Sequence, residues 1–401
     1  MSLATPIKKV YRYQLWRPVY LKKIFEDQLG IIGPLISKEE ALCNIFSWID
    51  QSFNATSDGG SSAYYQMGMG WQASYPETTG YLIPTLYKYA DHTADPHWRQ
   101  RALKAAKWLL SIQSSEGGWQ GLQINQKAPL KVFNTGMIID GLVCAYKREH
   151  DPAFFEAALR GAKWIYSNMD QNGRFSKNNH SNGGALDALV VASTLELLPY
   201  LEERDKQWLM EKAKFALNFI LSLATPNGLI NLCNDDHILK NRKTALTHHL
   251  GYVLDGLLRS YAFIKSDDCF DMVEKTAEKL MRLFEVRLSL ASEYYEDWSP
   301  YRDRFFGNYS MCLTGSSQMA VVWLRLFSYN KDLRFKNAAL KLTDQISCIS
   351  NRKYGVPGMD NGIAGSYPVN CFYQYYQFVN WAAKYHADAL LDSMQESNGA
   401  K

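Results

Sequence analysis

An all-α fold with two concentric rings of helices is predicted by a long repeat, by two alternating kinds of helix and by the lengths of the loops between them. The segment 95–112 recurs as 151–168, and eight of the eighteen aligned positions are identical. A repeat of this length is typical of stacked helical hairpins. Six hairpins that close into a ring form an (α/α)6 toroid, so we expect residues 38–401 to form a single domain of this kind.

Two of the outer helices have well-defined starts. Asp95 and Asp151 stand where an N-cap residue belongs, and each precedes a proline, whose missing N–H costs nothing at the first helical position. The segment 96–113 is amphipathic, as an outer helix should be, whereas 137–146 is apolar almost all round, as expected for an inner helix. The expected outer helices are 38–53, 96–113, 152–169, 205–224, 267–286 and 332–350, and the expected inner helices are 77–90, 133–149, 182–200, 246–264, 314–330 and 371–393.

All inner helices are expected to run in the same direction, so the loops that precede them gather at one end of the barrel. These loops are longer than typical connections, and long loops on a rigid scaffold usually carry function. Residues 1–37 are rich in Tyr, Arg and Lys, lie outside the repeat and are predicted to form an N-terminal arm or cap. The long loops span 54–76, 114–132, 170–181, 225–245, 287–313 and 351–370.

Composition and charge argue against several classes of protein. The net charge is +4, without a run of Lys and Arg, so we expect no nucleic-acid partner. Seven scattered cysteines without a Cys-x-x-Cys motif favour reduced thiols over a disulfide framework or a zinc site. Because the sequence shows neither a secretory signal nor an apolar membrane span, we expect a cytoplasmic protein. No nucleotide-binding motif is present, and we expect neither a cofactor nor a metal.

The long loops are rich in aromatic, Asn, Arg and His side chains, a composition that suits a sugar-binding groove. The faces of pyranose rings stack on aromatic rings, while sugar hydroxyls hydrogen-bond to planar polar groups. The predicted substrate-binding residues are Trp71, Tyr75, Trp119, Asn134, Asn182, His249, Arg302, Asn308 and Tyr367.

Four residues are predicted to be catalytic: Glu77, His248, Tyr309 and Asp187. In one hypothesis, His248 or Tyr309 removes the C5 proton of a uronate while Arg302 neutralises its carboxylate, as polysaccharide lyases and uronyl epimerases require. In the other, Glu77 and Asp187 share the acid and base roles of a glycoside hydrolase. The structural alternatives are an interaction of Glu77 with the helix dipole and a core position for His248.

Two further carboxylates are predicted to be structural. Asp140 and Asp255 occupy matching positions in Gly-x-x-x-Asp-Gly-Leu-x-x-x-Tyr, which occurs at 136–146 and 251–261. A carboxylate inside an apolar helix needs a partner, so we expect each to pair with a neighbouring helix or hydroxyl.

Several fragments resemble a family of bacterial (α/α)-toroid proteins found with glycosyltransferases in exopolysaccharide gene clusters, described as VpsJ-like, pectate-lyase-like or squalene-cyclase-like. The resemblance covers the chain from about residue 70 to the C-terminus. It implies a toroid, a polysaccharide substrate and a glycosyltransferase or export complex as partner. The run His180-Ser-Asn182 departs from the pattern expected of relatives. The matching fragments are Tyr75-Pro-Glu77-Thr-Thr-Gly80, Val132-Phe-Asn134-Thr-Gly136, Leu246-Thr-His248, Leu313-Thr-Gly315-Ser-Ser-Gln318, Gly365-Ser-Tyr367-Pro and Asn380-Trp381.

The sequence therefore predicts a carbohydrate-active enzyme that acts on an acidic, uronate-containing polysaccharide or oligosaccharide, as a lyase, epimerase or hydrolase. The alternative is a non-catalytic glycan-binding component of a polysaccharide synthesis complex, which needs no acid or base. Isoprenoid cyclisation ranks last because the acidic Asp-x-Asp-Asp cluster of squalene-type cyclases is missing.

Overall fold

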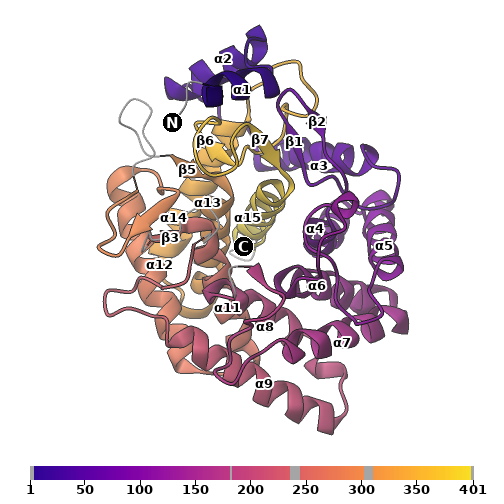
Figure 1. Cartoon of the computed structure of the whole chain (residues 1–401). Helices are drawn as coiled ribbons and strands as arrows, with labels where there is room; N and C mark the ends of the chain where they lie inside the picture. The colour runs from indigo at the N-terminus through magenta and orange to yellow at the C-terminus, as the bar shows by residue number, and fades with distance from the viewer. Residues whose placement is uncertain (1–3, 181–182, 235–243, 302–309, 399–401) are drawn as a thin grey trace.

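The chain forms an (α/α)6 toroid, in which an outer ring of helices surrounds an inner ring (Figure 1). The computed structural model describes residues 4–180, 183–234, 244–301 and 310–398. The inner helices pack side by side in chain order, and the last packs against the first, which closes the barrel. The outer helices are α3 (Lys38–Asn54), α5 (Pro96–Ser111), α7 (Pro152–Ser167), α9 (Glu203–Leu221), α12 (Asp267–Arg287) and α14 (Leu333–Ser350); the inner helices are α4 (Pro76–Thr93), α6 (Val132–Glu149), α8 (Ala188–Leu195), α11 (Thr247–Ile264), α13 (Leu313–Asn330) and α15 (Asn380–Asn398).

One end of the barrel, which we call the base, is closed by tight links from inner to outer helices. Four of these links have two residues each, and the first residue of each is left-handed: Ala94, His150, Lys265 and Lys331. In three links the second residue is an Asp that caps the next helix; the Asp95 carboxylate, for example, accepts from the His97 N–H at 2.9 Å. The N-caps predicted at Asp95 and Asp151 are therefore confirmed.

The third inner helix is shorter than predicted. The expected helix 182–200 is replaced by a 3-10 turn (η3, Ala185–Asp187), the eight-residue α8, and a second 3-10 turn (η4, Leu198–Tyr200). Gly183 has φ +81°, a conformation that does not continue into a helix, and Pro199 lacks the N–H that a longer helix would need. The prediction was wrong at both ends for these local reasons.

The opposite end, the mouth, carries short strands that the sequence does not predict. They pair segments that lie far apart in the chain, so that β1 pairs with β7 through Tyr65 and Phe378. These pairs fix the long loops over the barrel opening. The sheets are β2-β1-β7 (Gly70–Trp71, Tyr64–Gln66, Gln377–Val379), β3-β4 (Thr244–Leu246, Glu293–Tyr295) and β5-β6 (Met311–Cys312, Ser366–Tyr367).

Large aromatic side chains fill the space between the rings and beneath the loops. Trp48, Trp119 and Trp323 are almost completely buried, and each indole N–H has a backbone acceptor. Trp323 of α13, for instance, donates to the carbonyl of Ala277 in α12 at 3.1 Å. A buried indole that keeps its hydrogen bond contributes its full apolar area to stability without a desolvation penalty on the N–H.

Within the predicted arm, residues 4–37 contain the helices α1 (Ala4–Arg12) and α2 (Pro18–Gln28). It packs over the mouth-end loops (Figure 1). Tyr20 is buried and its hydroxyl accepts from the Gly68 N–H at 3.2 Å, while the Asp27 carboxylate accepts from the Val369 N–H at 2.9 Å. No helix in the described part of the chain is both long and apolar enough to cross a bilayer.

Candidate active site

The mouth of the barrel contains a cavity of about 260 Å³. Its walls come from the first residues of the inner helices and from the loops that precede them. Glu77 of α4 and His248 of α11 supply the carboxylate and the imidazole, and aromatic side chains provide half of the rest. The lining residues are Ala63, Tyr64, Tyr75, Glu77, Leu122, Gln123, Gln126, His248, Tyr252, Tyr373, Gln374 and Trp381.

Glu77 is the one carboxylate among the described residues that line this cavity. It lies in the first turn of α4 and is only 8% exposed. The Asn134 side-chain amide donates to Glu77 Oε2 at 2.7 Å, and Tyr75 also hydrogen-bonds to the carboxylate. Burial raises the pKa of Glu77 to about 7, and the bond from Tyr75 offsets this rise only in part. Glu77 can therefore both donate and accept a proton at neutral pH.

Asn134 joins Glu77 to the loop before the third inner helix. Its amide oxygen accepts from Nε2 of His180 at 2.9 Å, while its amide nitrogen serves Glu77. These contacts use both ends of the amide, so Asn134, which was predicted to bind substrate, holds the Glu77 carboxylate in place. His180 was not among the predicted site residues, because no local feature of the sequence indicates its contact with Asn134.

Asp187 lies beneath the same loop and does not line the cavity. Both of its carboxylate oxygens accept from the Asn179 side chain at 2.9 Å, and one accepts from the Gly184 N–H at 3.0 Å. Burial raises the pKa of Asp187 to about 7, although these hydrogen bonds lower it in part. Glu77 lines the mouth cavity and Asp187 does not, so this cavity by itself does not unite the predicted pair of acid and base.

His248 faces the cavity from the start of α11 and is oriented by α13. Its Nδ1 lies 2.9 Å from Oε1 of Gln318, and because an amide oxygen can only accept, Nδ1 carries the proton. Whenever the imidazole is neutral, Nε2 is then the nitrogen that can accept a proton. The ring also packs against Tyr252 and Tyr373, with centroid distances of 4.4 and 5.2 Å.

Two glycines allow α11 and α13 to approach closely enough for this contact. A Cβ at Gly251 would lie 2.6 Å from the Gln318 Cβ, and one at Gly315 would lie 2.5 Å from the backbone nitrogen of His248. Either methyl group would separate the helices. Gly251 and Gly315 therefore hold His248 and Gln318 at hydrogen-bonding distance.

The second histidine of the pair has a different environment. His249 is buried, does not line the cavity, and its Nδ1 has no hydrogen-bond partner among the described residues. Burial, together with the nearby His180, lowers the pKa of His249 to about 4, so the ring is neutral at physiological pH. Tyr252, which the sequence analysis did not select, lines the cavity one turn after His248. The i, i+4 spacing on one helix could have identified it.

Three predicted substrate-binding residues do not line the mouth cavity. Trp119 is completely buried and its indole donates to the Leu109 carbonyl at 2.8 Å, so its ring faces are covered by the core. Trp71 packs on Trp48, with ring centroids 4.9 Å apart, and does not line the cavity. Tyr367 borders a separate small hollow beside the arm. The remaining predicted residues, Asn182, Arg302, Asn308 and Tyr309, lie outside the described residues.

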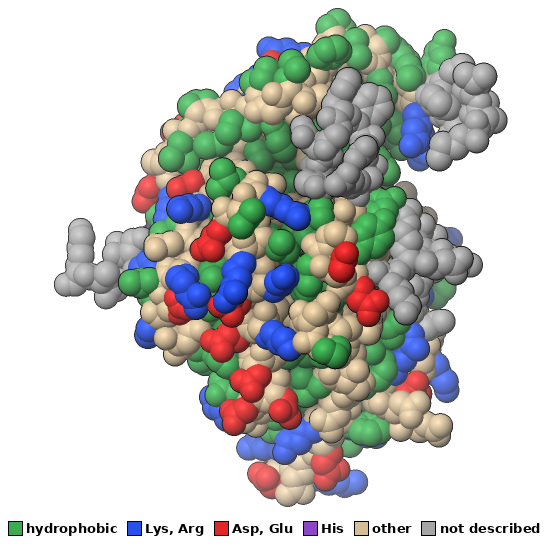
Figure 2. All heavy atoms as spheres, turned by 90° about the vertical axis from the view of Figure 1, so that its left-hand side faces the viewer, with side chains coloured by type: hydrophobic (Ala, Val, Ile, Leu, Met, Phe, Trp, Pro, Cys, Tyr) green, Lys and Arg blue, Asp and Glu red, His purple; other side chains and the backbone are tan. Residues whose placement is uncertain are grey.

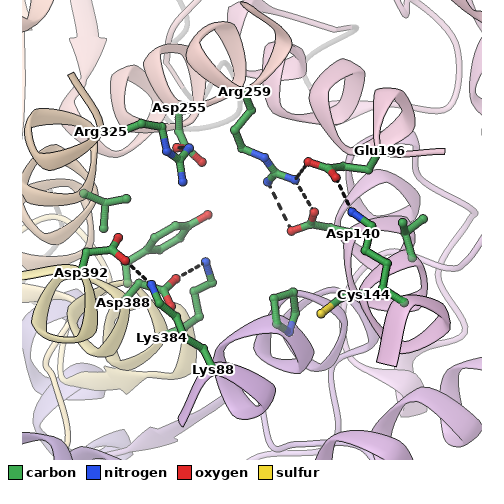
Figure 3. Close-up of a pocket in the computed structure, with 15 residues that line it drawn as sticks. Lys88, Asp140, Cys144, Glu196, Asp255, Arg259, Arg325, Lys384, Asp388 and Asp392 are labelled. Carbon is green, nitrogen blue, oxygen red and sulfur yellow. Dashed lines mark hydrogen bonds and ion pairs between the residues drawn. The ribbon is translucent and has the colours of Figure 1, made fainter. Parts of the chain in front are cut away.

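A second cavity, of about 280 Å³, occupies the lower part of the barrel toward the base (Figure 3). Three tyrosines lie between the two cavities: Tyr252 lines the upper one, Tyr385 lines the lower one, and the ring centroid of Tyr385 is 6.0 Å from that of Tyr252 and 6.1 Å from that of Tyr81. The lower cavity is lined by Pro84, Lys88, Asp140, Val143, Cys144, Lys147, Glu196, Asp255, Arg259, Val321, Arg325, Lys384, Tyr385, Asp388 and Asp392.

Each acidic group of the lower cavity has a basic partner. Figure 3 shows side chains from neighbouring helices pointing toward one another around the hollow. Although burial alone would raise it, the Arg259 guanidinium holds the pKa of Asp140 below its ordinary value. Both carboxylates are paired as predicted, Asp255 with the neighbouring α13 and Asp140 with α11, one helix beyond its neighbour α8. The ion pairs are Arg259 with Asp140 and Glu196, Lys147 with Glu196, Arg325 with Asp255, Lys88 with Asp392, and Lys384 with Asp388.

Comparison with solved structures shows which proteins share this fold. An unsaturated glucuronyl hydrolase specific for heparin superposes with a TM-score of 0.71 at 13% identity, over 90% of this chain and 98% of that chain. The unsaturated glucuronyl hydrolase of Bacillus sp. GL1 gives 0.67 at 14% identity, over 88% and 96% of the two chains. Cellobiose 2-epimerase of Bacillus thermoamylovorans gives 0.68 at 12% identity, over 90% and 99%. No protein-family profile and no curated protein sequence matches the chain.

Proposed function

We propose that the protein is a carbohydrate-active enzyme that moves protons to and from a sugar bound in the mouth cavity. The observation that carries this proposal is Glu77, a buried carboxyl with a pKa of about 7 that shares an aromatic cavity with His248. The glucuronyl hydrolases and the cellobiose epimerase named above, which have the same fold, support a sugar as substrate. The cavity volume of about 260 Å³ suits the end of an oligosaccharide better than an extended polymer.

Epimerase or lyase chemistry fits this cavity better than two-carboxylate hydrolysis. A glycoside hydrolase of the usual kind needs two carboxyl groups flanking the bond, whereas the described lining contributes only Glu77. In the proposed reaction, His248 Nε2 removes the proton on the carbon next to a carbonyl or carboxylate. The electron pair of that C–H bond moves onto the oxygen, which Glu77 protonates, and either return of a proton to carbon or loss of a leaving group completes the reaction.

The class of substrate depends on whether a Lys or Arg side chain is present to neutralise a substrate carboxylate. No Lys or Arg lies among the described lining residues, so the carboxylate of a uronate would depend on Arg302, whereas a neutral sugar needs no cation. We keep a uronate-containing oligosaccharide as the first substrate to test and a neutral reducing disaccharide as the second. The exopolysaccharide setting, a glycosyltransferase or export-complex partner, and a cytoplasmic location stay predictions of the sequence.

The test is proton exchange in deuterated water. Oligosaccharides of both classes are incubated with the protein, and deuterium on carbon is followed by NMR beside assays for new reducing ends and for unsaturated uronates. Because an acid or base contributes about 100- to 10,000-fold to a rate, we expect Glu77→Gln and His248→Asn each to reduce exchange by at least about 100-fold. The exposed control variants Glu116→Gln and His97→Asn should retain full activity.

Three outcomes would contradict the proposal. New reducing ends without deuterium on carbon would indicate hydrolysis instead. Sugar binding that both active-site variants leave unchanged, with no exchange in the unmodified protein, would favour the non-catalytic glycan-binding role. Full deuterium exchange by the Glu77→Gln variant would show that Glu77 takes no part in the reaction.

A further inference from the structure

Exposed hydrophobic side chains are concentrated on the N-terminal arm. Nine of the twenty large hydrophobic residues that are exposed in the described part of the chain lie between residues 10 and 35, a segment that makes up a small fraction of the protein. Figure 2 shows hydrophobic side chains along the upper edge of the molecule, where Figure 1 places the arm. Such a concentration marks an interaction surface. We call these residues the arm patch: Val10, Tyr11, Trp16, Leu21, Phe25, Leu29, Ile31, Ile32 and Leu35.

The arm patch is one side of a firmly anchored unit. Leu21, Phe25 and Leu29 follow one another at intervals of four residues along α2 and its end, so they share one face. The opposite face carries the buried Tyr20, Lys23 and Asp27 and is held to the toroid by polar contacts. The Tyr20 hydroxyl accepts from the Gly68 N–H at 3.2 Å, and the Asp27 carboxylate accepts from the Val369 N–H at 2.9 Å. The exposed hydrophobic face is therefore presented outward by a defined structure.

The polar residues beside the patch are basic. Lys8, Lys9, Arg12 and Arg17 are exposed and form no ion pair with any described residue. The two acidic residues of the arm are neutralised on its inner side: Glu26 pairs with Arg352 at 2.6 Å, and Asp27 pairs with Lys23 at 2.7 Å. The outward face of the arm thus combines hydrophobic and aromatic side chains with an excess of positive charge.

We propose that the arm patch docks on the surface of an anionic lipid bilayer. Hydrophobic and aromatic side chains that enter the boundary between headgroups and acyl chains, flanked by Lys and Arg, are the features of helices that lie in a membrane interface. Anionic headgroups complement the basic residues. A second copy of the chain fits less well, because two arms face to face would bring like charges together.

Docking would place the candidate active site close to the bilayer. The arm packs on the loops at 66–70 and 367–376; for example, Gln14 donates to the Gly68 carbonyl at 2.6 Å, and the ring centroids of Tyr13 and Tyr376 are 5.1 Å apart. Gln374, in the second of these loops, lines the mouth cavity. A saccharide held at the membrane surface would then lie near the mouth.

Flotation of the full chain with lipid vesicles tests the proposal. We expect binding to vesicles made of equal parts phosphatidylglycerol and phosphatidylcholine, and little binding to phosphatidylcholine alone. The double variant Phe25→Glu with Leu29→Glu should abolish binding, and Lys8→Glu with Arg12→Glu should weaken it at least about tenfold. The matched control Leu333→Glu, which changes an exposed leucine on α14 outside the arm, should bind normally.

Because the substituted side chains are exposed, we expect each variant to fold, and thermal unfolding of each variant checks this. Failure to bind the anionic vesicles, or equal binding by the Phe25→Glu, Leu29→Glu variant, would overturn the proposal. A concentration-dependent dimer in analytical ultracentrifugation that the same double variant dissociates would also overturn it and assign the arm patch to a second copy. None of these outcomes depends on catalytic activity, so the proposed reaction is tested separately.

Discussion

The two cavities of the barrel have similar volumes but opposite electrostatics. In the lower cavity, each carboxylate has a Lys or Arg partner, and the pKa of Asp140 is lowered. In the mouth cavity, Glu77 has hydrogen bonds from neutral groups and no basic partner among the described lining residues, and its pKa is raised to about 7. The comparison shows that the density of charged residues does not locate a reactive site. A buried acid without a counter-ion is a better indicator of a reactive site, because it can exchange its proton near neutral pH.

The largest expected difference between the two cavities is in how their carboxyl groups change the free energy of unfolding with pH. The folded-state pKa of Glu77, about 7, lies above the ordinary value of 4.5, so its burial penalty is absent below about pH 4.5, grows as the pH rises to about 7, and then stays constant. Denaturant unfolding at several pH values should show Glu77→Gln stabilising the protein at pH 8 by up to about 3 kcal/mol and having little effect at pH 4. Asp140 should show the opposite sign, since a lowered pKa stabilises the fold above pH 3.8 and this contribution is lost in acid. A stability difference for Glu77→Gln that does not vary with pH would contradict the assigned environment.

A slightly smaller effect should come from breaking an ion pair in the lower cavity. Asp140→Asn leaves Arg259 with only Glu196, at 3.5 Å, and should lower the free energy of unfolding by about 2–3 kcal/mol, somewhat less than for a fully buried pair. The control Asp91→Asn breaks an exposed pair with Arg148 and should cost less than about 1 kcal/mol. Urea titration measures both. A large loss of catalytic rate in folded Asp140→Asn would show that the lower cavity takes part in the reaction.

The smallest expected effect concerns the orientation of His248. Gln318→Leu removes the acceptor at Nδ1, so the ring populates the other neutral tautomer and the basic Nε2 is lost part of the time. We expect kcat to fall by about tenfold with a smaller change in KM, as for removal of one hydrogen bond worth about 1.4 kcal/mol. Nitrogen-15 NMR of the imidazole reports the tautomer directly. The variant Gln318→Glu keeps an acceptor at this position and should retain most of the tautomer that has its proton on Nδ1. An unchanged tautomer in Gln318→Leu would leave Gln318 without a positioning role.

Most of the fold was predictable because its signals are local. The Asp-Pro starts and the contrast between amphipathic and apolar helices located both rings, and the recurrence of Asp140 and Asp255 in one motif identified them as structural. The mouth was less predictable, because β1 and β7 join segments about 310 residues apart and the strands have only two or three residues. Glu77 and His248, which line the mouth cavity, were selected from their positions at inner-helix starts. Trp119 was misassigned because sequence does not show which face of a loop aromatic is covered, and Gln318 was not selected because its role depends on the approach of α13 to Gly251.

The contrast between two-residue links at the base and long segments at the mouth has an evolutionary consequence. Insertions and substitutions above the barrel can alter the bound substrate without moving a helix, whereas an insertion in a base link would displace a capped helix from the ring. A framework of this kind can therefore keep its shape while the sequence changes almost everywhere else. The fold of this chain superposes on those of glucuronyl hydrolases and a cellobiose epimerase at only 12–14% identity.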